Sequence, residues 1–308
     1  MRPKITVIGS LNMDLVVQSC RFPTSGETVL GESLKYLPGG KGANQAVAAS
    51  RLGADVTLIG AVGDDIYGEK LIDMLKENKV NTARIKIVPG ESSGVAIIFL
   101  DKEDNRITVI QGANAQCKKE DIDNNQDIIS ESDLVLIQLE IPLETVQHAV
   151  QLAKKYKKTV ILNPAPARKL PDELLRQIDI ITPNETELKV LTATNKVNTE
   201  TLKYSIDRLL EHDVQHVVAT MGEKGALYKA KHQEIKSYPG YHVNVVDTTG
   251  AGDSFNGGLA FALGSGLPIS DALTFANKVA ALSVGKFGAQ SSMPHIDDVL
   301  KFEAIENI

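Results

Sequence analysis

A regular alternation of apolar runs and longer amphipathic segments is the feature that most constrains this chain. Residues 56–62, 134–139, 159–162, 179–182 and 217–220 are predicted strands, and 67–78 and 143–157 are predicted helices. The first run, Ile5–Gly9, shows no polar alternation, which is typical of a strand buried on both faces. Strand–helix–strand units repeated along most of a chain predict a parallel sheet covered by helices on both faces. We therefore expect an α/β fold with a central, mostly parallel sheet.

Two stretches break this alternation. Residues 16–17 and 28–37 are predicted strands, as are 94–100 and 106–110, which the charged turn Asp101–Asn105 joins. Four such strands do not fit a rhythm of alternating strands and helices. We predict a small separate β-sheet, a lid, formed by insertions at about 15–38 and 93–111 into one domain that spans residues 1–308.

Composition excludes several classes of function. The net charge is −6 and no basic run occurs, so a nucleic-acid partner is not expected. No stretch approaches the roughly 18 apolar residues of a membrane span, and the short apolar run after the basic N-terminus does not resemble a signal peptide. Cys20 and Cys117 match no metal or redox spacing. These features predict a cytoplasmic protein that binds neither membranes nor nucleic acid.

A glycine-rich turn lies between the extended run Tyr241–Val246 and an apolar helix that begins near Phe255. A turn that opens a helix exposes backbone N–H groups and the positive end of the helix dipole, which together form a seat for an anion. Asp253 stands beside this seat. A carboxylate there repels phosphate, so general-base chemistry would explain its presence. Taken alone, the turn is better explained as a strand–turn–helix corner with Asp in the first turn, and only the rest of the chain favours the anion site.

A second glycine-rich turn, Gly39–Asn44, opens an Ala-rich helix that ends before Gly53. Lys41 lies among its glycines, where it could meet a polar ligand or simply be solvated. Ser10–Asp14 follows the first strand, at the edge where α/β sheets bind ligands, although an ordinary turn explains it as well. The chain has no P-loop, and Phe255 replaces the third glycine of a dinucleotide fingerprint.

Several segments, in matching order, resemble the motifs of one enzyme family. Gly9–Asp14 and Gly39–Asn44 resemble a sugar-binding signature, Thr182–Glu187 an Asn-x-x-Glu motif, and Asp247–Asp253 an anion-hole motif of the ribokinase/PfkB-like carbohydrate kinase family. Asn163–Arg168 and Gly288–Gln290 narrow the resemblance to members that phosphorylate ribose. The resemblance covers nearly the whole chain.

The resemblance implies roles for individual positions. Asp253 is similar to the general base that takes a proton from the 5-hydroxyl of the sugar, and Gly250, Ala251 and Gly252 correspond to the anion hole for the γ-phosphoryl group. Contacts to ribose are matched by Asn12, Met13, Asp14, Gly39, Gly40, Lys41, Gly42, Ala43, Asn44, Glu140 and Asp253 itself. Contacts to ATP are matched by Asn184, Glu187, Thr220, Met221, Gly222, Glu223, Lys224, Gly225, Gly252 and Asn277, with Glu187 steering Mg²⁺ through water. A loop for a monovalent cation, K⁺, is matched by Asp247, Thr249, Ser283, Lys286, Gly288 and Ser292.

The resemblance therefore implies an ATP-dependent, Mg²⁺-requiring enzyme that phosphorylates D-ribose at O5 to give ribose 5-phosphate and ADP. Two helix starts would supply positive ends in place of a P-loop. A homodimer joined through the lid is expected, with ribose and ATP as the small-molecule partners. The alternatives are another sugar or nucleoside kinase, such as a deoxyribokinase, and a catalytically silent sugar sensor. A sensor could lose the catalytic residues freely. Their presence therefore argues against a sensor: Asp253, Gly250, Gly252 and the Asn184/Glu187 pair.

Overall fold

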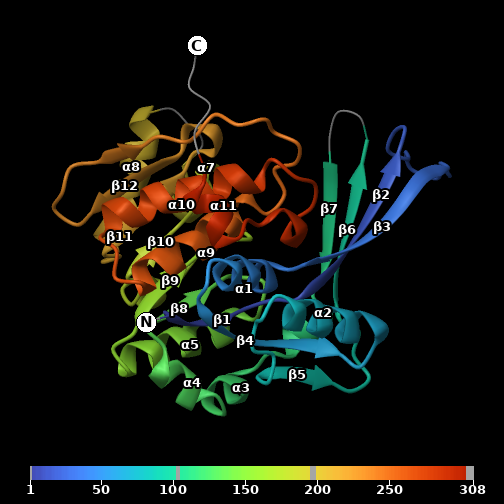
Figure 1. The fold of residues 1–308 in the computed structure, drawn as a ribbon, viewed down its shortest axis with the longest axis horizontal. Coiled ribbons are helices and arrows are strands. Elements are labelled where there is room, and N and C mark those ends of the chain that lie inside the picture. Colours follow the sequence, from blue (N-terminus) through green and yellow to red (C-terminus); the bar gives the residue numbers. More distant parts are fainter. Residues whose placement is uncertain (1, 102–104, 195–198, 303–308) are drawn as a thin grey trace.

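A nine-stranded sheet forms the centre of the molecule in the computed structural model, which describes residues 2–101, 105–194 and 199–302 (Figure 1). All neighbouring strands from β5 to β11 are parallel, whereas β12 and β13 are antiparallel. The predicted α/β fold with a mostly parallel sheet is thus confirmed. The order is β13 (Lys236–Tyr238), β12 (Ala226–Ala230), β11 (His216–Thr220), β10 (Ile180–Ile181), β9 (Thr159–Leu162), β8 (Leu134–Ile137), β1 (Lys4–Ile8), β4 (Asp55–Gly63) and β5 (Ile85–Val88).

Successive residues of the central strands face two separate hydrophobic cores. In β8, Leu134 and Leu136 pack into one core, and Val135 and Ile137 into the other. Burial on both faces explains why these strands lack polar alternation. The first core packs against α1 (Lys41–Arg51), α2 (Ile66–Glu77), α9 (Ala251–Gly264) and α10 (Ile269–Ser283). The second packs against α3 (Lys119–Asp123), α4 (Gln126–Glu131), α5 (Leu143–Lys155), α6 (Asp172–Leu175), α7 (Glu185–Thr192) and α8 (Thr199–Glu211). The short α11 (Ile296–Leu300) packs on α10.

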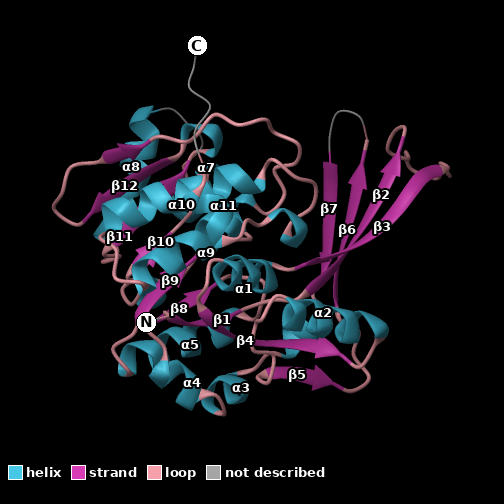
Figure 2. Cartoon of the chain, in the orientation of Figure 1, coloured by secondary structure: helices cyan, strands magenta, loops and turns pink. Residues whose placement is uncertain are grey.

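The lid is a separate four-stranded sheet, as predicted. Its order is β3 (Gly31–Gly39), β2 (Asn12–Ser19), β6 (Gly94–Leu100) and β7 (Asn105–Ile110), and only the β2–β6 pair is parallel. Figure 1 shows it standing beside the main body, with its base near α1 and α2, and Figure 2 shows its strands in magenta. Within the predicted turn Asp101–Asn105, residues 102–104 lie outside the described residues.

The strand β2 begins earlier than the sequence suggested. It starts at Asn12, where it pairs with Gly39 of β3 and Gly94 of β6. From Asn12 onward, the segment after the first strand, which the sequence left open between a ligand-binding edge and an ordinary turn, is therefore already part of the lid. Asn12 and Asp14 consequently link the main sheet to the lid.

The predicted extended run Tyr241–Val246 leads into the glycine turn without joining either sheet. The segment is a loop, and the backbone N–H of Val246 donates to the carbonyl of Val284 at the end of α10, at 2.8 Å. Its β-branched residues favour an extended backbone, which here bonds to a helix end and not to a neighbouring strand. Among the described residues, no helix combines the length and apolarity needed to cross a membrane.

Candidate functional site

Helix α9 begins at a glycine whose backbone conformation is easy only for a residue without a side chain. Gly250 has φ +77°, in the left-handed region, and no side chain caps the helix. The N–H of Ala251 donates to the carbonyl of Thr248 at 3.2 Å, but within the described part of the chain the N–H groups of Gly252 and Asp253 have no acceptor. Two free donors at the positive end of a 14-residue helix form a candidate anion site.

Helix α1 also begins at a left-handed glycine, Gly40, but its first N–H groups are already bonded. Lys41 donates to the Oε2 atom of Glu140 at 3.0 Å, and Gly42 and Ala43 donate to the Oγ and carbonyl atoms of Ser10 at 3.3 and 2.9 Å. Of the two helix starts expected to face a ligand, α9 therefore has free N–H groups, whereas protein acceptors occupy the start of α1.

The carboxylate of Asp253 lies between these two helices. It is 7% exposed; its Oδ2 atom accepts a hydrogen bond from Nδ2 of Asn44 at 2.9 Å, and its Oδ1 atom accepts one from Nε2 of Gln45 at 2.9 Å. Each carboxylate oxygen has a further lone pair. The group is thus held by two amides and can still accept a proton from a substrate hydroxyl.

A cluster of charges surrounds this carboxylate. Burial first, and then the charges of Glu140 and Asp253, raise the pKa of Asp14 to about 7, with Lys41 opposing them. Burial disfavours the charged form of Lys41, but Asp253, Glu140, Glu187 and Asp14 outweigh it and raise the pKa of this lysine. The structure therefore brings the candidate sugar-binding residues Asp14, Lys41 and Glu140 close enough for their charges to act on one another and Asp253. Of these four residues, Lys41 and Asp253 line the small cavity described next, whereas Asp14 and Glu140 line neither cavity.

A small cavity of about 180 Å³ lies at the start of α9. Its lining includes the candidate base Asp253, the glycine turn at Gly250–Gly252 and Lys41 of α1, so it joins distant parts of the sequence. Its lining consists of Lys41, Asn163, Ala165, Thr182, Asn184, Glu187, Thr220, Thr248, Gly250, Ala251, Gly252, Asp253 and Asn256.

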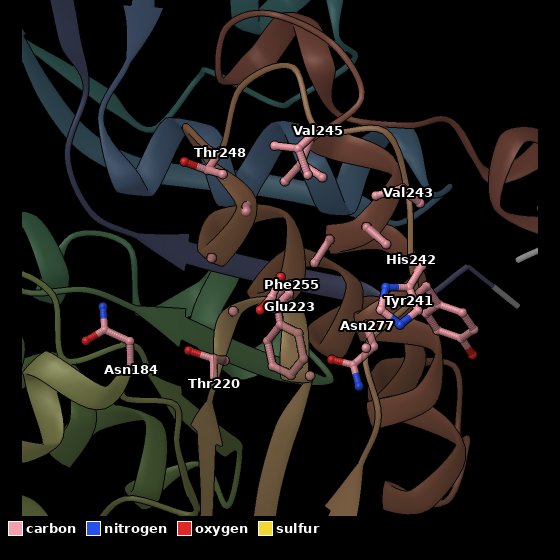
Figure 3. Close-up of a pocket in the computed structure, with 18 of the residues that line it drawn as sticks. Asn184, Thr220, Glu223, Tyr241, His242, Val243, Val245, Thr248, Phe255 and Asn277 are labelled. Carbon is pink, nitrogen blue, oxygen red and sulfur yellow. The ribbon is translucent and has the colours of Figure 1, made fainter. Parts of the chain in front are cut away.

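A larger cavity of about 670 Å³ adjoins it (Figure 3). The two share Asn184, Thr220, Thr248, Ala251 and Gly252. Of the candidate ATP-binding residues, Gly222, Glu223, Gly225 and Asn277 also line the larger cavity, whereas Met221 and Lys224 do not. Figure 3 shows Asn184 and Thr220 on one side, with Tyr241, His242 and Asn277 on the other.

The sequence did not identify the apolar wall of this larger cavity. That wall is formed by Tyr241, His242, Val243, Val245, Phe255, Ala280, Ala281 and Val284. The signal was present in the predicted extended run Tyr241–Val246, to which the sequence assigned no role in binding a ligand. Because the run is a loop, its side chains are available to face a ligand.

Asn184 and Glu187 form a capping box at the start of α7. The backbone N–H of Asn184 donates to Oε2 of Glu187 at 2.8 Å, and the N–H of Glu187 donates to Oδ1 of Asn184 at 2.8 Å. Burial raises the pKa of Glu187, against the opposing effects of the Asn184 hydrogen bond and Lys41. Throughout the described ranges, no three His, Cys, Asp or Glu side chains gather to hold a metal ion. A cation beside Glu187 would need water or a ligand to complete its coordination.

The candidate cation-loop residues lie on two segments that Asp247 joins. Its Oδ1 atom accepts from the N and Oγ1 atoms of Thr249 at 2.9 and 2.7 Å, and Oδ2 accepts from the N–H of Gly288 at 2.9 Å. Burial disfavours the ionised carboxylate, but these hydrogen bonds outweigh it and lower the pKa of Asp247. Ser283 and Ser292 donate their hydroxyls to nearby backbone carbonyls at 2.8 Å, and Lys286 is exposed.

Four buried amide side chains around Asp253 received no role from the sequence: Gln45, Gln138, Asn163 and Gln290. Gln290 donates to Oδ1 of Asn44 at 3.2 Å, so it supports the amide that holds Asp253. The local signals were Gln45 beside Asn44 in an Ala-rich helix, and the places of Asn163 and Gln290 within two segments that resemble the family.

Comparisons with known proteins agree along the whole chain. Residues 2–296 match the model of a family described as pfkB family carbohydrate kinase. The ribokinase of Bacillus subtilis is 44% identical over 96% of this chain and 97% of its own, and the deoxyribokinase of Salmonella typhi is 40% identical over 95% and 96%. The structure of Arabidopsis thaliana ribokinase complexed with ribose and ATP superimposes with a TM-score of 0.91 and 32% identity, covering 98% of this chain and 100% of that one.

Proposed function

The chain belongs to the pfkB family of carbohydrate kinases, and on that premise we propose that it phosphorylates D-ribose. The γ-phosphoryl group of ATP is transferred to the 5-hydroxyl of ribose, giving ribose 5-phosphate and ADP. Phosphoryl transfer depends mainly on positioning and on stabilising the charge of the transferred group, with one group to accept the proton of the alcohol.

The observation that carries this proposal is the set of groups that line the small cavity. The Asp253 carboxylate, the Lys41 ammonium and the free N–H groups at the start of α9 all meet there. In the proposed reaction Asp253 takes the proton of the 5-hydroxyl, while the N–H groups of Gly252 and Asp253 donate to the transferring phosphoryl group. Lys41 supplies a positive charge on the opposite helix.

Ribose is proposed to bind between the lid and α1. Asp14, at the base of the lid, offers acceptors to the sugar hydroxyls, and Lys41 and Asn44 approach from α1. The remaining proposed contacts are Asn12, Met13, Gly39, Gly40, Gly42, Ala43 and Glu140. Met13 is 3% exposed within the hydrophobic core, so we propose that it acts through its backbone. A lid over the sugar excludes water, which competes for the phosphoryl group.

ATP is proposed to occupy the larger cavity, with its phosphates directed through the five shared residues toward Asp253. The apolar wall suits a purine base, and Asn184, Thr220, Gly222, Glu223, Gly225 and Asn277 supply polar edges. We assign Met221 and Lys224 a supporting role in the same turn. The Glu187 carboxylate faces the small cavity and fits Mg²⁺, which usually keeps several waters and takes one or two carboxylates besides the phosphates. When bound, Mg²⁺ would neutralise phosphate charge.

A monovalent cation, K⁺, is proposed to bind the loops joined by Asp247. Supporting this, Asp247 ties Thr249, just before the glycine turn, to Gly288. Backbone carbonyls near Ser283, Lys286, Gly288 and Ser292 would complete the coordination. Such a cation would fix the backbone that aims the N–H groups of α9.

The test is ADP release measured over a panel of pentoses, hexoses and nucleosides with Mg-ATP and KCl. We expect ribose to give the highest kcat/KM. The 40% identity to a deoxyribokinase makes 2-deoxyribose the second candidate. A higher kcat/KM for 2-deoxyribose would replace the proposed substrate, and no sugar-dependent ADP release would favour the silent sensor.

A further inference from the structure

A circuit of hydrogen bonds runs through buried side chains from the carboxylate of Asp253 to the backbone carbonyl of Gly252 in the glycine turn. Nε2 of Gln45 donates to Oδ1 of Asp253 at 2.9 Å and to Oδ1 of Asn163 at 3.0 Å. Nδ2 of Asn163 donates to the carbonyl of Thr182 at 3.2 Å. The hydroxyl of Thr182 donates to Oδ1 of Asn256 at 2.6 Å, and Nδ2 of Asn256 donates to the carbonyl of Gly252 at 2.8 Å.

Every side chain of this circuit is buried. Gln45 and Thr182 are 0% and 1% exposed, and Asn163 and Asn256 are 7% and 1% exposed. They come from α1, the ends of β9 and β10, and α9. A buried polar side chain that loses its partner is costly, so the members of such a network hold one another in place.

Chemistry fixes the direction of each bond. The Asp253 carboxylate and the Thr182 carbonyl can only accept, so Gln45 must present its NH₂ group to Asp253, and Asn163 must present its NH₂ group to Thr182. Both hydrogens of the Gln45 NH₂ group are then used, one on Asp253 and one on Asn163. A flipped Gln45 would place its oxygen against two other oxygens. The orientation of this amide is therefore unique.

A third partner fixes the other end of the Gln45 side chain. Its Oε1 atom accepts from Nε2 of Gln138 at 2.6 Å. Gln138 is 0% exposed, and its own oxygen has no partner among the described residues. A Cβ atom at Gly9 would lie 2.0 Å from that oxygen, so glycine makes room for Gln138. The fold thus accepts a buried unpaired oxygen at Gln138 while this side chain supports Gln45.

We propose that Gln45 is a positioning residue for phosphoryl transfer. It holds the Asp253 carboxylate in one rotamer and, through Asn163, Thr182 and Asn256, ties that rotamer to the Gly252 turn that receives the phosphoryl group. This inference rests on the proposed function. Gln45 lines neither cavity, so it acts on the base and not on the substrates.

The first test is Gln45→Met, which keeps the length of the side chain and removes both its donors and its acceptor. We expect kcat to fall about 10- to 100-fold, the range expected for losing one hydrogen bond to a charged group. KM for ribose and for ATP should change less than about threefold, because the lost interaction is not one of substrate binding. A change in KM without a fall in kcat overturns the inference, as does a kcat within about threefold of wild type.

A double-mutant cycle with Gln138→Met separates positioning from general loss of structure. Gln138 reaches Asp253 only through Gln45, so Gln138→Met should lower kcat less than Gln45→Met does. The double variant should be no slower than Gln45→Met alone. Additive losses would contradict the proposal. If Gln45→Met does not fold, Gln138→Met and Asn163→Ala take its place, and each should lower kcat at unchanged KM. A wild-type kcat in both variants would overturn the proposal.

Two controls complete the design. Asn125→Leu removes another buried amide, one that donates to the carbonyl of Asp121 beside α4 and lies outside both cavities. It should lower the melting temperature without lowering kcat; an equal loss of kcat would make the Gln45 effect merely structural. Asp253→Asn distinguishes the two proposals. If it is inactive while Gln45→Met is fully active, only the positioning role fails; if it is fully active, the assigned base fails as well.

Discussion

Asn44 Nδ2 donates a 2.9 Å hydrogen bond to Asp253 Oδ2, joining two residues that lie 209 positions apart. Asn44 belongs to the first turn of α1, and Asp253 to the first turn of α9. The same contact places a candidate sugar-binding residue against the candidate base. The two glycine-opened helices therefore build one site, in which α1 holds the carboxylate and α9 offers the free N–H groups.

Asp14 is expected to read the 2-hydroxyl of the sugar. A buried carboxylate needs hydroxyl donors, so a sugar without the 2-hydroxyl leaves an acceptor unpaired, at a cost of about 1–3 kcal/mol. Wild type should prefer ribose to 2-deoxyribose by about 10- to 100-fold in kcat/KM. Asp14→Ala should lose ribose activity and narrow this gap. Equal kcat/KM for both sugars in wild type would contradict this role and favour a deoxyribokinase.

The raised pKa of Asp14, about 7, predicts a pH-dependent stability of the sugar-free protein. The folded state keeps its proton between about pH 4 and 7, where the unfolded chain has released it, so stability falls as pH rises through this window. An asparagine side chain does not ionise, so Asp14→Asn does not lose stability in this way as the pH rises. Its free energy of unfolding relative to wild type should increase by up to about 4 kcal/mol from pH 4 to pH 8.

Denaturant titrations at several pH values measure this difference. The exposed Asp73→Asn provides a matched change of charge and should show a nearly constant difference over the same range. A constant difference for Asp14→Asn as well would show that its environment does not penalise the carboxylate.

Potassium should activate the enzyme more than lithium at equal ionic strength. Asp247 connects the proposed cation loops to the segment before Gly250, so an ion there would steady the N–H groups of α9. Asp247→Asn should weaken the response to K⁺. Initial rates measured with KCl and LiCl test this, and identical rates in wild type would exclude the site.

The lid is expected to join two copies of the chain. Exposed apolar side chains lie on it, including Leu34 and Tyr36 of β3 and Ile107 and Val109 of β7. A small sheet with free edges and exposed apolar residues is a pairing surface. Light scattering at micromolar concentration with ribose should give a dimer, and Ile107→Lys with Val109→Lys should give a monomer. Only monomer in wild type would contradict the expectation.

The sequence predicted the fold well because its signals are local. Apolar runs without polar alternation marked the doubly buried strands, and glycine turns marked the starts of α1 and α9. The cavity-lining role of Tyr241–Val246 depends on tertiary contacts, which the sequence does not show. The β-branched residues of this run favour an extended backbone, but Val246 bonds to the end of α10, and the segment lines a cavity.

The parts of the site that sequence could not give depend on contacts between distant segments. Glu140 closes the start of α1 from 99 residues away. The partners of Gln45 come from the ends of β8 and β9 and from α9, so no spacing along the chain reveals them. Of the two amides that hold Asp253, the family resemblance singled out Asn44, whereas Gln45 received no role.

The measurement that tests the central proposal most directly is kcat of Asp253→Asn for ribose, followed by ADP release with saturating Mg-ATP and KCl. This variant keeps the shape of the side chain but removes the base, so kcat should fall about 10²–10⁴-fold. Binding of ribose and ATP, measured by calorimetry, should persist. A variant that keeps more than about a tenth of the wild-type kcat would show that Asp253 is not the general base.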